Sequence, residues 1–314
     1  MITFIICSIR PEVCNRLLQN LSETAGVEYE TIVFDNRDAQ WGLCRVYNHC
    51  AEKARFPYLC FLHEDIRIET KAWGKKMIET VEKIPDCGVA GFAGGLQMGK
   101  NATSWWAGPT RMNIYSGSKG KNHLDLKLNY THHLYSNPDT EEVSQVLCVD
   151  GVFHFVRKTI WELIRYDEDS FSGFHFYDVD FSFAVAEKYS NYALLNFDVF
   201  HDSDGSINAD YLKNMFVFQR KWNRKLPKNI KGEYPVSAEL SEAFTMFILC
   251  LKKHVSIKKC GVQIYRINKL PLFILILFYI PVQVVIKIFY RIMRQRKSAS
   301  AFSPQLLRAS KIEN

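Results

Sequence analysis

The sequence predicts an α/β fold in which helices flank a mixed central sheet. Apolar runs of strand length alternate four times with helical segments within the first 95 residues, which is typical of a doubly wound sheet. Three of these runs end in polar residues, at the strand ends where such sheets bind ligands. The chain has 314 residues, of which 47% are hydrophobic and 14% aromatic, so it can form a large packed core.

The first half of the predicted fold follows from apolar runs and the segments between them. Continuous apolar runs predict buried strands at residues 3–7, 30–34, 58–62 and 88–92. The intervening segments predict a helix that begins at Pro11 and helices over 43–54 and 71–83. Pro11 suits a first helical turn, where a backbone N–H has no partner within the helix. The regular alternation supports the α/β class.

The second half is less regular. Residues 91–120 are rich in Gly, Trp, Ser and Asn and predict an irregular or mobile loop region. Further along, the patterns predict strands over 146–156 and 192–200, an aromatic loop over 171–176, and helices over 158–164, 177–188 and 209–222. A stretch with Pro and Gly at 225–235 predicts a boundary between a domain at 1–225 and a helical C-terminal region at 226–314.

The net charge of +7 is unevenly distributed. Residues 252–314 contain 13 Lys and Arg and one acid, a balance of +12, whereas residues 1–251 have a balance of −5. An acidic body argues against a nucleic-acid binder with a basic groove, so we expect no nucleic-acid partner. The basic tail instead suggests contact with an anionic surface.

An apolar segment within this tail predicts association with a membrane. Residues 270–286 contain no charge, and 17 helical residues span about 26 Å, barely the width of a bilayer core. Basic residues on both sides give no inside bias, which favours an in-plane or re-entrant anchor on anionic headgroups. A single span and a buried core helix are the alternatives. The nine scattered cysteines fit a reducing compartment, so we expect the cytoplasmic face of a membrane.

Acidic and histidine side chains mark three possible functional sites. Asp65 follows the strand at 58–62 and could hold a divalent cation that clamps a diphosphate, or could simply belong to a surface turn. Asp178 and Asp180 open a predicted helix, where a carboxylate can cap the helix or act as a general base. His201 follows a predicted strand and could be structural or a cation ligand.

The order of these segments resembles that of family 2-type glycosyltransferases with the GT-A (Rossmann-like) fold. The resemblance covers about residues 2–223. In that family a strand ending in an acid is followed by a strand ending in an Asp-x-Asp metal motif, and later by a Glu-Asp-x-Asp motif that opens a helix. The matching segments here are 3–8, 33–36, 42–48, 61–65, 149–151 and 177–180.

The resemblance implies a role for each matching residue. Asp178 would be the catalytic base, and Mg²⁺ or Mn²⁺ would be held by His63, Asp65 and His201. The residues expected to bind a nucleotide sugar are Cys7, Ser8, Arg10, Asp35, Asn36, Arg45, Asn48 and Glu64. Those expected on the acceptor side are Trp106, Asp150, Gly151 and Asp180. Trp106 could equally be a hydrophobic anchor for its loop.

Two residues depart from the family pattern. His63 stands where the family has its first Asp, and Tyr177 stands where it has Glu. His63-Glu64-Asp65 resembles a smaller branch of the family that has His at this position. The resemblance implies an inverting, metal-assisted transfer from a nucleotide sugar to a glycan or lipid-linked saccharide in surface polysaccharide synthesis. The two departures leave a second interpretation, an inactive GT-A domain that binds glycans or scaffolds a membrane complex.

Overall fold

The structure is a computed structural model that describes the chain except for residues 102–103, 119–128, 136–141, 204–206 and 253–314. All counts below refer to the described residues. Residues 1–255 form one compact unit. The apolar segment at 270–286 lies outside the described residues, and among the helices that are described none has the length and apolar character needed to span a bilayer.

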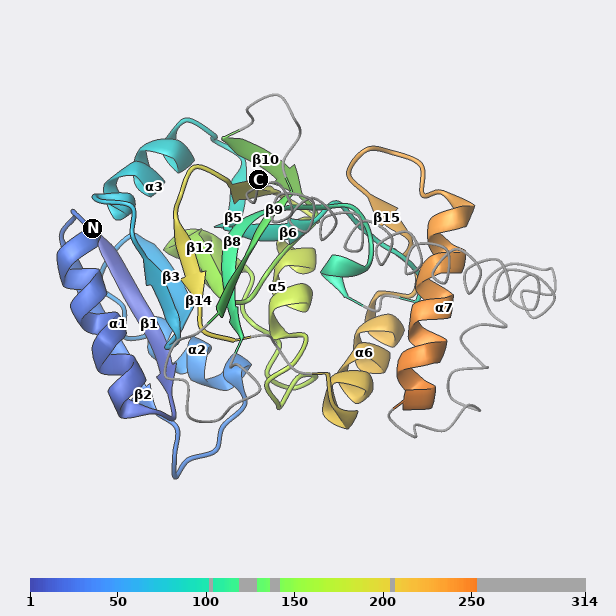
Figure 1. The fold of residues 1–314 in the computed structure, drawn as a ribbon, viewed down its shortest axis with the longest axis horizontal. Coiled ribbons are helices and arrows are strands. Elements are labelled where there is room, and N and C mark those ends of the chain that lie inside the picture. Colours follow the sequence, from blue (N-terminus) through green and yellow to red (C-terminus); the bar gives the residue numbers. More distant parts are fainter. Residues whose placement is uncertain (102–103, 119–128, 136–141, 204–206, 253–314) are drawn as a thin grey trace, which may run out of the picture. The chain divides into compact units, whose positions relative to one another are not determined.

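A seven-stranded mixed sheet forms the centre of this unit (Figure 1). The strand order is β10 (Val143–Val146), β13 (Ser190–Leu194), β5 (Cys87–Gly91), β12 (Phe153–Arg157), β3 (Tyr58–His63), β1 (Ile2–Ser8) and β2 (Tyr29–Asp35). β1 pairs in parallel with β2 and β3, whereas β12 runs antiparallel between β3 and β5. This confirms the predicted mixed α/β fold.

The apolar composition of β1 explains its burial between β3 and the edge strand β2. Six of its seven residues are buried, because both faces of the strand are covered, as in the parallel part of α/β sheets. Its register places Cys7 opposite His63 and Ser8 opposite Asp35. The polar ends of three neighbouring strands therefore lie at one edge of the sheet.

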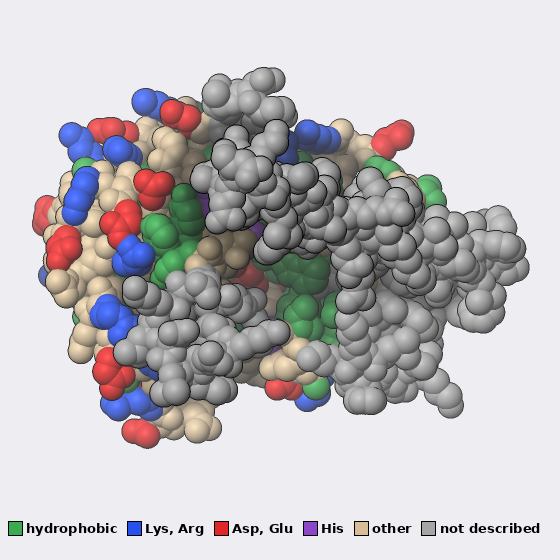
Figure 2. All heavy atoms as spheres, in the orientation of Figure 1, with side chains coloured by type: hydrophobic (Ala, Val, Ile, Leu, Met, Phe, Trp, Pro, Cys, Tyr) green, Lys and Arg blue, Asp and Glu red, His purple; other side chains and the backbone are tan. Residues whose placement is uncertain are grey.

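The helices pack through apolar faces. In α1 (Pro11–Thr24), Cys14, Leu17 and Leu21 are buried at three- and four-residue spacing, so one face of the helix meets the sheet. Figure 2 shows basic and acidic side chains interspersed over the exposed surface of α1 and α3. The other helices are α2 (Leu43–Ala51), α3 (Trp73–Glu82), α4 (Lys158–Leu163), α5 (Tyr177–Val185), α6 (Ala209–Trp222) and α7 (Val236–Lys252), with a short 3₁₀ turn η1 (Trp105–Ala107).

A second, six-stranded sheet lies across the strand ends that carry the polar residues. Its order is β11 (Cys148–Val149), β6 (Ala93–Gly95), β8 (Thr110–Ser118), β14 (Val199–His201) and β4 (Ile66–Ile68), with β9 (Asn129–Tyr135) paired to β8. A small separate pair joins β7 (Gln97–Met98) to β15 (Lys228–Asn229).

The expectation of an irregular region at 91–120 is wrong, because β6, β7 and β8 lie there. The glycines in this region allow close backbone approach and do not mark a loop. A Cβ atom at Gly94 would lie 2.4 Å from the carbonyl oxygen of Cys148, and one at Gly95 would lie 2.1 Å from that of Trp105. The single strands expected at 146–156 and 192–200 are also divided, each between the two sheets.

Candidate functional site

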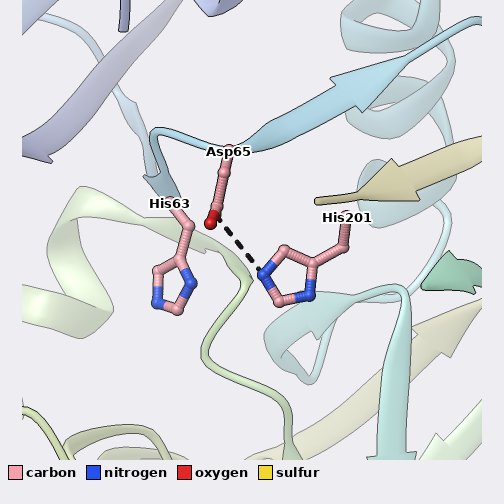
Figure 3. A group of neighbouring side chains, drawn as sticks. All are labelled: His63, Asp65 and His201. Atoms are coloured by element: carbon pink, nitrogen blue, oxygen red, sulfur yellow. Dashed lines mark ion pairs between the residues drawn. The ribbon is translucent and has the colours of Figure 1, made fainter. Parts of the chain in front are cut away.

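Two histidines and an aspartate gather where the two sheets meet (Figure 3). His63 ends β3, Asp65 follows in the turn before β4, and His201 ends β14. One ligand atom from each residue lies within 4.8 Å of the others. We refer to these three residues as the cation cluster.

The cation cluster has donor atoms suited to a divalent cation. The Nε2 atom of His201 lies 3.4 Å from Oδ1 of Asp65 but is buried and makes no hydrogen bond to a described residue. Apart from this long ion pair, the buried nitrogen has no partner among the described residues, and a bound cation would supply one. Imidazole nitrogen and carboxylate oxygen are common ligands of divalent metals. The residues present therefore fit the metal that the resemblance implies.

The charges in the cation cluster favour the metal-binding protonation states of Asp65 and His63. Burial alone would raise the pKa of Asp65, but His201, His63 and Arg10 outweigh burial and hold that pKa below its usual range. Burial, with the neighbouring His201, lowers the pKa of His63 to about 4. Near neutral pH, Asp65 is therefore ionised and His63 is neutral, as metal ligands must be. For His201, burial alone would lower the pKa, but the neighbouring Asp65 carboxylate outweighs burial and raises it, so a bound cation would have to displace a proton from this ring.

A buried glutamate positions an arginine beside the cation cluster. Glu64 accepts hydrogen bonds from Ser8 Oγ at 2.7 Å and from Arg10 Nε at 2.9 Å. Arg10 in turn donates from Nη2 to Asp65 Oδ2 at 2.9 Å. Ser8 and Glu64, both predicted to bind a nucleotide sugar, bond to each other, and Glu64, which lines the same cavity as Arg10, also holds the guanidinium group of Arg10 in place.

Two cavities of similar size meet at the cation cluster. The first cavity has a volume of about 730 Å³ and the second about 740 Å³, and both are lined by His63 and Asp65. The first cavity is also lined by Cys7, Arg10, Asn36, Gln40, Trp41 and Phe174. The second is also lined by Trp106, Asp150, Tyr177, Asp178, His201 and Tyr211. The cluster thus faces both cavities.

Asp35 and Arg45 lie outside the described lining of the first cavity. Asp35 is exposed and pairs with Arg37, with Oδ2 and Nη2 2.6 Å apart, and this pairing lowers its pKa to about 2. The guanidinium of Arg45 instead lies 3.7 Å from the centre of the Trp41 ring. The predicted nucleotide contacts of Asp35 and Arg45 are therefore not supported by their positions.

Asn48 is a structural residue. Its side chain is buried, with Nδ2 donating to the carbonyl oxygen of Tyr166 at 2.8 Å and Oδ1 accepting from the N–H of Tyr166 at 3.2 Å. The Oδ1 atom also accepts from Trp161 Nε1 at 3.3 Å. These bonds use both acceptor positions of Oδ1 and one of the two Nδ2 protons, so the position of Asn48 does not support the predicted contact with a nucleotide sugar.

Asp178, at the start of α5, is placed to act as a base in the second cavity. Its Oδ2 atom accepts a hydrogen bond from the N–H of Gly151 at 3.0 Å. Burial, with the nearby carboxylate of Asp150, raises the pKa of Asp178 to about 7. A carboxylate with this pKa is partly ionised at neutral pH and can accept a proton efficiently.

Asp180 does not belong to the second cavity. It is buried and accepts hydrogen bonds from Lys221 Nζ and Trp222 Nε1, each at 2.7 Å. It therefore joins α5 to α6, and its position does not support the predicted acceptor-side role. Asp150 and Trp106 do line the second cavity, and 40% of Trp106 is exposed.

Sequence reasoning missed the role of Tyr177. Its hydroxyl group lies 2.7 Å from His63 Nε2 and 2.8 Å from the carbonyl oxygen of Gly151. The signal was present, because His63 and Tyr177 are the two departures from the family pattern, and they contact each other. Gly151 supports Tyr177 and Asp178 through its backbone. Trp41 and Phe174 line the first cavity, but no pattern in the sequence distinguished them from other aromatic residues.

Comparison with known proteins gives a family. A model described as a glycosyltransferase-like family matches residues 3–215, a segment that contains the cation cluster and Asp178. Comparison with curated proteins finds no match.

Among solved structures, the chain is similar to GalNAc-T7 with UDP, GalNAc and Mn²⁺, at 12% identity and a TM-score of 0.48, over 85% of this chain and 56% of that chain. It is similar to S. aureus TarS 1-349 at 14% identity and a TM-score of 0.42, over 88% and 78% of the respective chains. The mannosyltransferase PcManGT from Pyrobaculum calidifontis, in complex with GDP-Man and Mn²⁺, gives 10% identity and a TM-score of 0.45, over 90% and 80%.

Proposed function

We propose that this chain, which belongs to the glycosyltransferase-like family, is a nucleotide-sugar-dependent glycosyltransferase that transfers the sugar to an acceptor hydroxyl with inversion at the anomeric carbon. The observation that carries this proposal is the meeting of two cavities at the cation cluster, with Asp178 lining the second cavity and not the described part of the first. A donor in one cavity and an acceptor in the other would meet between these groups.

The first cavity is suited to a nucleotide sugar. Its volume of about 730 Å³ accommodates a ligand of this size. Arg10, which Glu64 and Asp65 hold by hydrogen bonds, supplies a planar cation that can donate to diphosphate oxygens. Trp41 also lines this cavity, with the guanidinium of Arg45 packed on its ring.

His63, Asp65 and His201 would hold the divalent cation, Mg²⁺ or Mn²⁺, near the diphosphate. When bound, such a cation neutralises the negative charge that develops on the departing nucleoside diphosphate. The position of the cluster between the two cavities supports this role.

Asp178 acts as the general base towards the acceptor. The acceptor oxygen forms a bond to the anomeric carbon while the bond between that carbon and the diphosphate oxygen breaks, and the hydroxyl proton passes to the Asp178 carboxylate. The pKa of about 7 for Asp178 matches this task at neutral pH. An inactive glycan-binding module would have no need of a carboxylate tuned in this way, so the enzyme is the favoured interpretation.

The acceptor in this proposal is a glycan or lipid-linked saccharide. Trp106, which is partly exposed at the second cavity, offers an aromatic face on which a sugar ring can stack. The basic, apolar tail at 252–314 would rest on an anionic membrane surface. These features support our proposal that the enzyme acts at the cytoplasmic face of a membrane in surface polysaccharide synthesis.

The Asp178→Asn variant tests the role of the base. It retains the shape of the side chain and is expected to lower kcat for sugar transfer by about 10²–10⁴-fold while the thermal unfolding transition remains cooperative. Asp169→Asn, a change to an exposed aspartate, is the matched control and should leave transfer unchanged. Equal transfer by wild type and Asp178→Asn would contradict the proposal.

A further inference from the structure

A chain of hydrogen bonds runs from the cation cluster to the segment that carries the base. His63 Nε2 lies 2.7 Å from the hydroxyl oxygen of Tyr177, and that hydroxyl lies 2.8 Å from the carbonyl oxygen of Gly151. The N–H of the same glycine donates to Asp178 at 3.0 Å. The chain joins residues that are more than 100 positions apart.

Counting protons along this chain assigns the tautomer of His63. A carbonyl oxygen can only accept, so the single hydroxyl proton of Tyr177 must point to Gly151. The hydroxyl oxygen can then only accept from His63, so the proton of the neutral imidazole resides on Nε2. The lone pair of His63 is therefore on Nδ1.

The Nδ1 atom faces the cation cluster. Figure 3 shows one ring nitrogen of His63 on the side that faces His201, and the other on the opposite side of the ring. The two histidine rings have centroids 5.8 Å apart, with the Asp65 carboxylate beside them. With Nε2 bonded to Tyr177, Nδ1 is the nitrogen available to a cation.

The backbone leaves Tyr177 little freedom to move. Its side chain is buried, and a Cβ atom at position 151 would lie 2.2 Å from its hydroxyl oxygen. Glycine at this position is thus what allows the hydroxyl group to approach the carbonyl oxygen. The turn that precedes β12 packs closely against α5, and the hydrogen-bond chain depends on this packing.

We propose that Tyr177 is a positioning residue that fixes His63 as its Nε2–H tautomer and so directs the Nδ1 lone pair to the cation site. The resulting cation cluster presents two imidazoles and one carboxylate. Imidazole is a better ligand for first-row transition metals than for Mg²⁺, which prefers oxygen. The cluster therefore binds Mn²⁺ in preference to Mg²⁺. This inference rests on the proposed function only in locating the cation site, and its test requires no sugar transfer.

Direct Mn²⁺ binding tests the positioning role. The dissociation constant is measured on the full-length protein from the electron paramagnetic resonance signal of free Mn²⁺. Tyr177→Phe is expected to weaken Mn²⁺ binding by about 10–100-fold, the effect typical of losing a hydrogen-bond partner of a metal-binding histidine. Unchanged Mn²⁺ affinity in this variant would overturn the proposal.

Tyr166→Phe is the matched control. Its buried hydroxyl also bonds to a histidine ring, at 3.0 Å from Nδ1 of His154, but that histidine is outside the cation cluster. We expect Mn²⁺ affinity within about twofold of wild type for this variant. An equal loss in both variants would indicate a general packing effect and contradict the specific role of Tyr177.

Competition with Mg²⁺ tests the metal preference. We expect displacement of Mn²⁺ to need a Mg²⁺ concentration at least about tenfold higher than the concentration needed at a site whose protein ligands are all oxygen atoms. His63→Asp should narrow the difference between the two metals and should also remove the effect of Tyr177→Phe on Mn²⁺ affinity. Equal affinities of the wild type for Mg²⁺ and Mn²⁺ would overturn the preference.

A measurement on the wild type keeps the inference testable if the Tyr177 variant does not fold. Two-bond ¹⁵N–¹H correlation spectra distinguish the two tautomers of His63 in the metal-free protein, and we expect Nε2–H. A dominant Nδ1–H form would overturn the proposal. If Mn²⁺ binding follows the predictions but no nucleotide sugar is turned over, the proposed function fails and this inference stands. If sugar is transferred but Mn²⁺ affinity does not depend on Tyr177, this inference fails and the proposed function stands.

Discussion

The pairing of Asp150 with Asp178 predicts a specific change in the pH dependence of sugar transfer. Both carboxylates line the second cavity, and Asp150 helps to raise the pKa of Asp178 to about 7. Asp150→Asn removes the negative charge. The Oδ1 atom of asparagine can still accept the bond from the N–H of Val152, which is 3.1 Å long in the wild type. The charge therefore changes while the local structure is retained.

The size of the effect follows from the causes of the raised pKa. The pKa of Asp178 rises from 3.8 to about 7, with burial as the larger cause and Asp150 as the second. Asp150 is thus the smaller of the two causes that raise the pKa, and backbone hydrogen bonds partly offset both. Removing a like charge favours the ionised form, so the pKa of Asp178 should fall by about 1 in Asp150→Asn. At pH 6 this raises the ionised fraction about fivefold.

The assay is the initial rate of nucleoside diphosphate release between pH 5 and 9. The base must be ionised, so kcat should rise with pH through the pKa of Asp178 and level off above it. In Asp150→Asn the rising limb should move to lower pH by about 1. If the rising limb of the pH profile stays at the same pH in Asp150→Asn, or moves to higher pH, the reasoning is refuted. The limb would then not report the ionisation of Asp178 with a pKa raised by Asp150.

Three further predictions concern other parts of the structure. Asp180→Asn removes one of the two carboxylates that pair with Lys221, while Asp167 remains, and should cost about 2 kcal/mol of stability. Calorimetry should show this as a Tm lower by roughly 4–8 °C, with kcat retained well below the transition; full loss of kcat at unchanged Tm would restore a direct role in catalysis. Glu64→Gln should loosen Arg10 and raise KM for the nucleotide sugar by about tenfold, and an unchanged KM would contradict the positioning of Arg10. Asn48→Ala should lower stability by about 2 kcal/mol in chemical denaturation without changing KM for the donor; a KM effect alone would argue that Asn48 contacts the nucleotide sugar.

The parts of the fold that the sequence predicted are those whose signal is local. The strand at 58–62 and the helix at 209–222 are visible because burial on both faces or on one stripe leaves a characteristic apolar pattern. β8 also pairs with β14, which lies far along the chain and places Phe200 opposite Tyr115, and the composition of β8 is mixed. Gly94 and Gly95 suggested a loop because close backbone packing and turns use the same residue type.

The site residues show the same difference between signals that are local in the sequence and contacts that are not. Asp65, Asp178 and His201 were found because strand ends and helix starts converge on one edge of an α/β sheet. The contacts of Asp180 could not be foreseen because its partners lie about 40 residues further along the chain, in α6. Asn48 could have been recognised, since Cys44 and Ala51 on the same face of α2 are apolar and buried, which indicates an inward-facing position.

The contact between His63 and Tyr177 shows what a comparison of motifs alone leaves out. Each residue on its own is a departure from the family pattern and argues against activity. In the structure the two form a hydrogen-bonded pair, 2.7 Å apart, beside the base. Where the family pattern has Asp and Glu, this chain has His63 and Tyr177, which form a neutral pair. In our proposal Tyr177 orients His63 as a ligand of the cation.

The most direct test of the central claim is a screen of nucleotide sugars for nucleoside diphosphate release by the full-length protein with Mn²⁺. It is run in parallel with a chelator and with Asp178→Asn. The account predicts release from at least one donor, abolished by the chelator and strongly reduced in the variant. Release that withstands both the chelator and the loss of the Asp178 carboxylate, or no release from any donor, would contradict it.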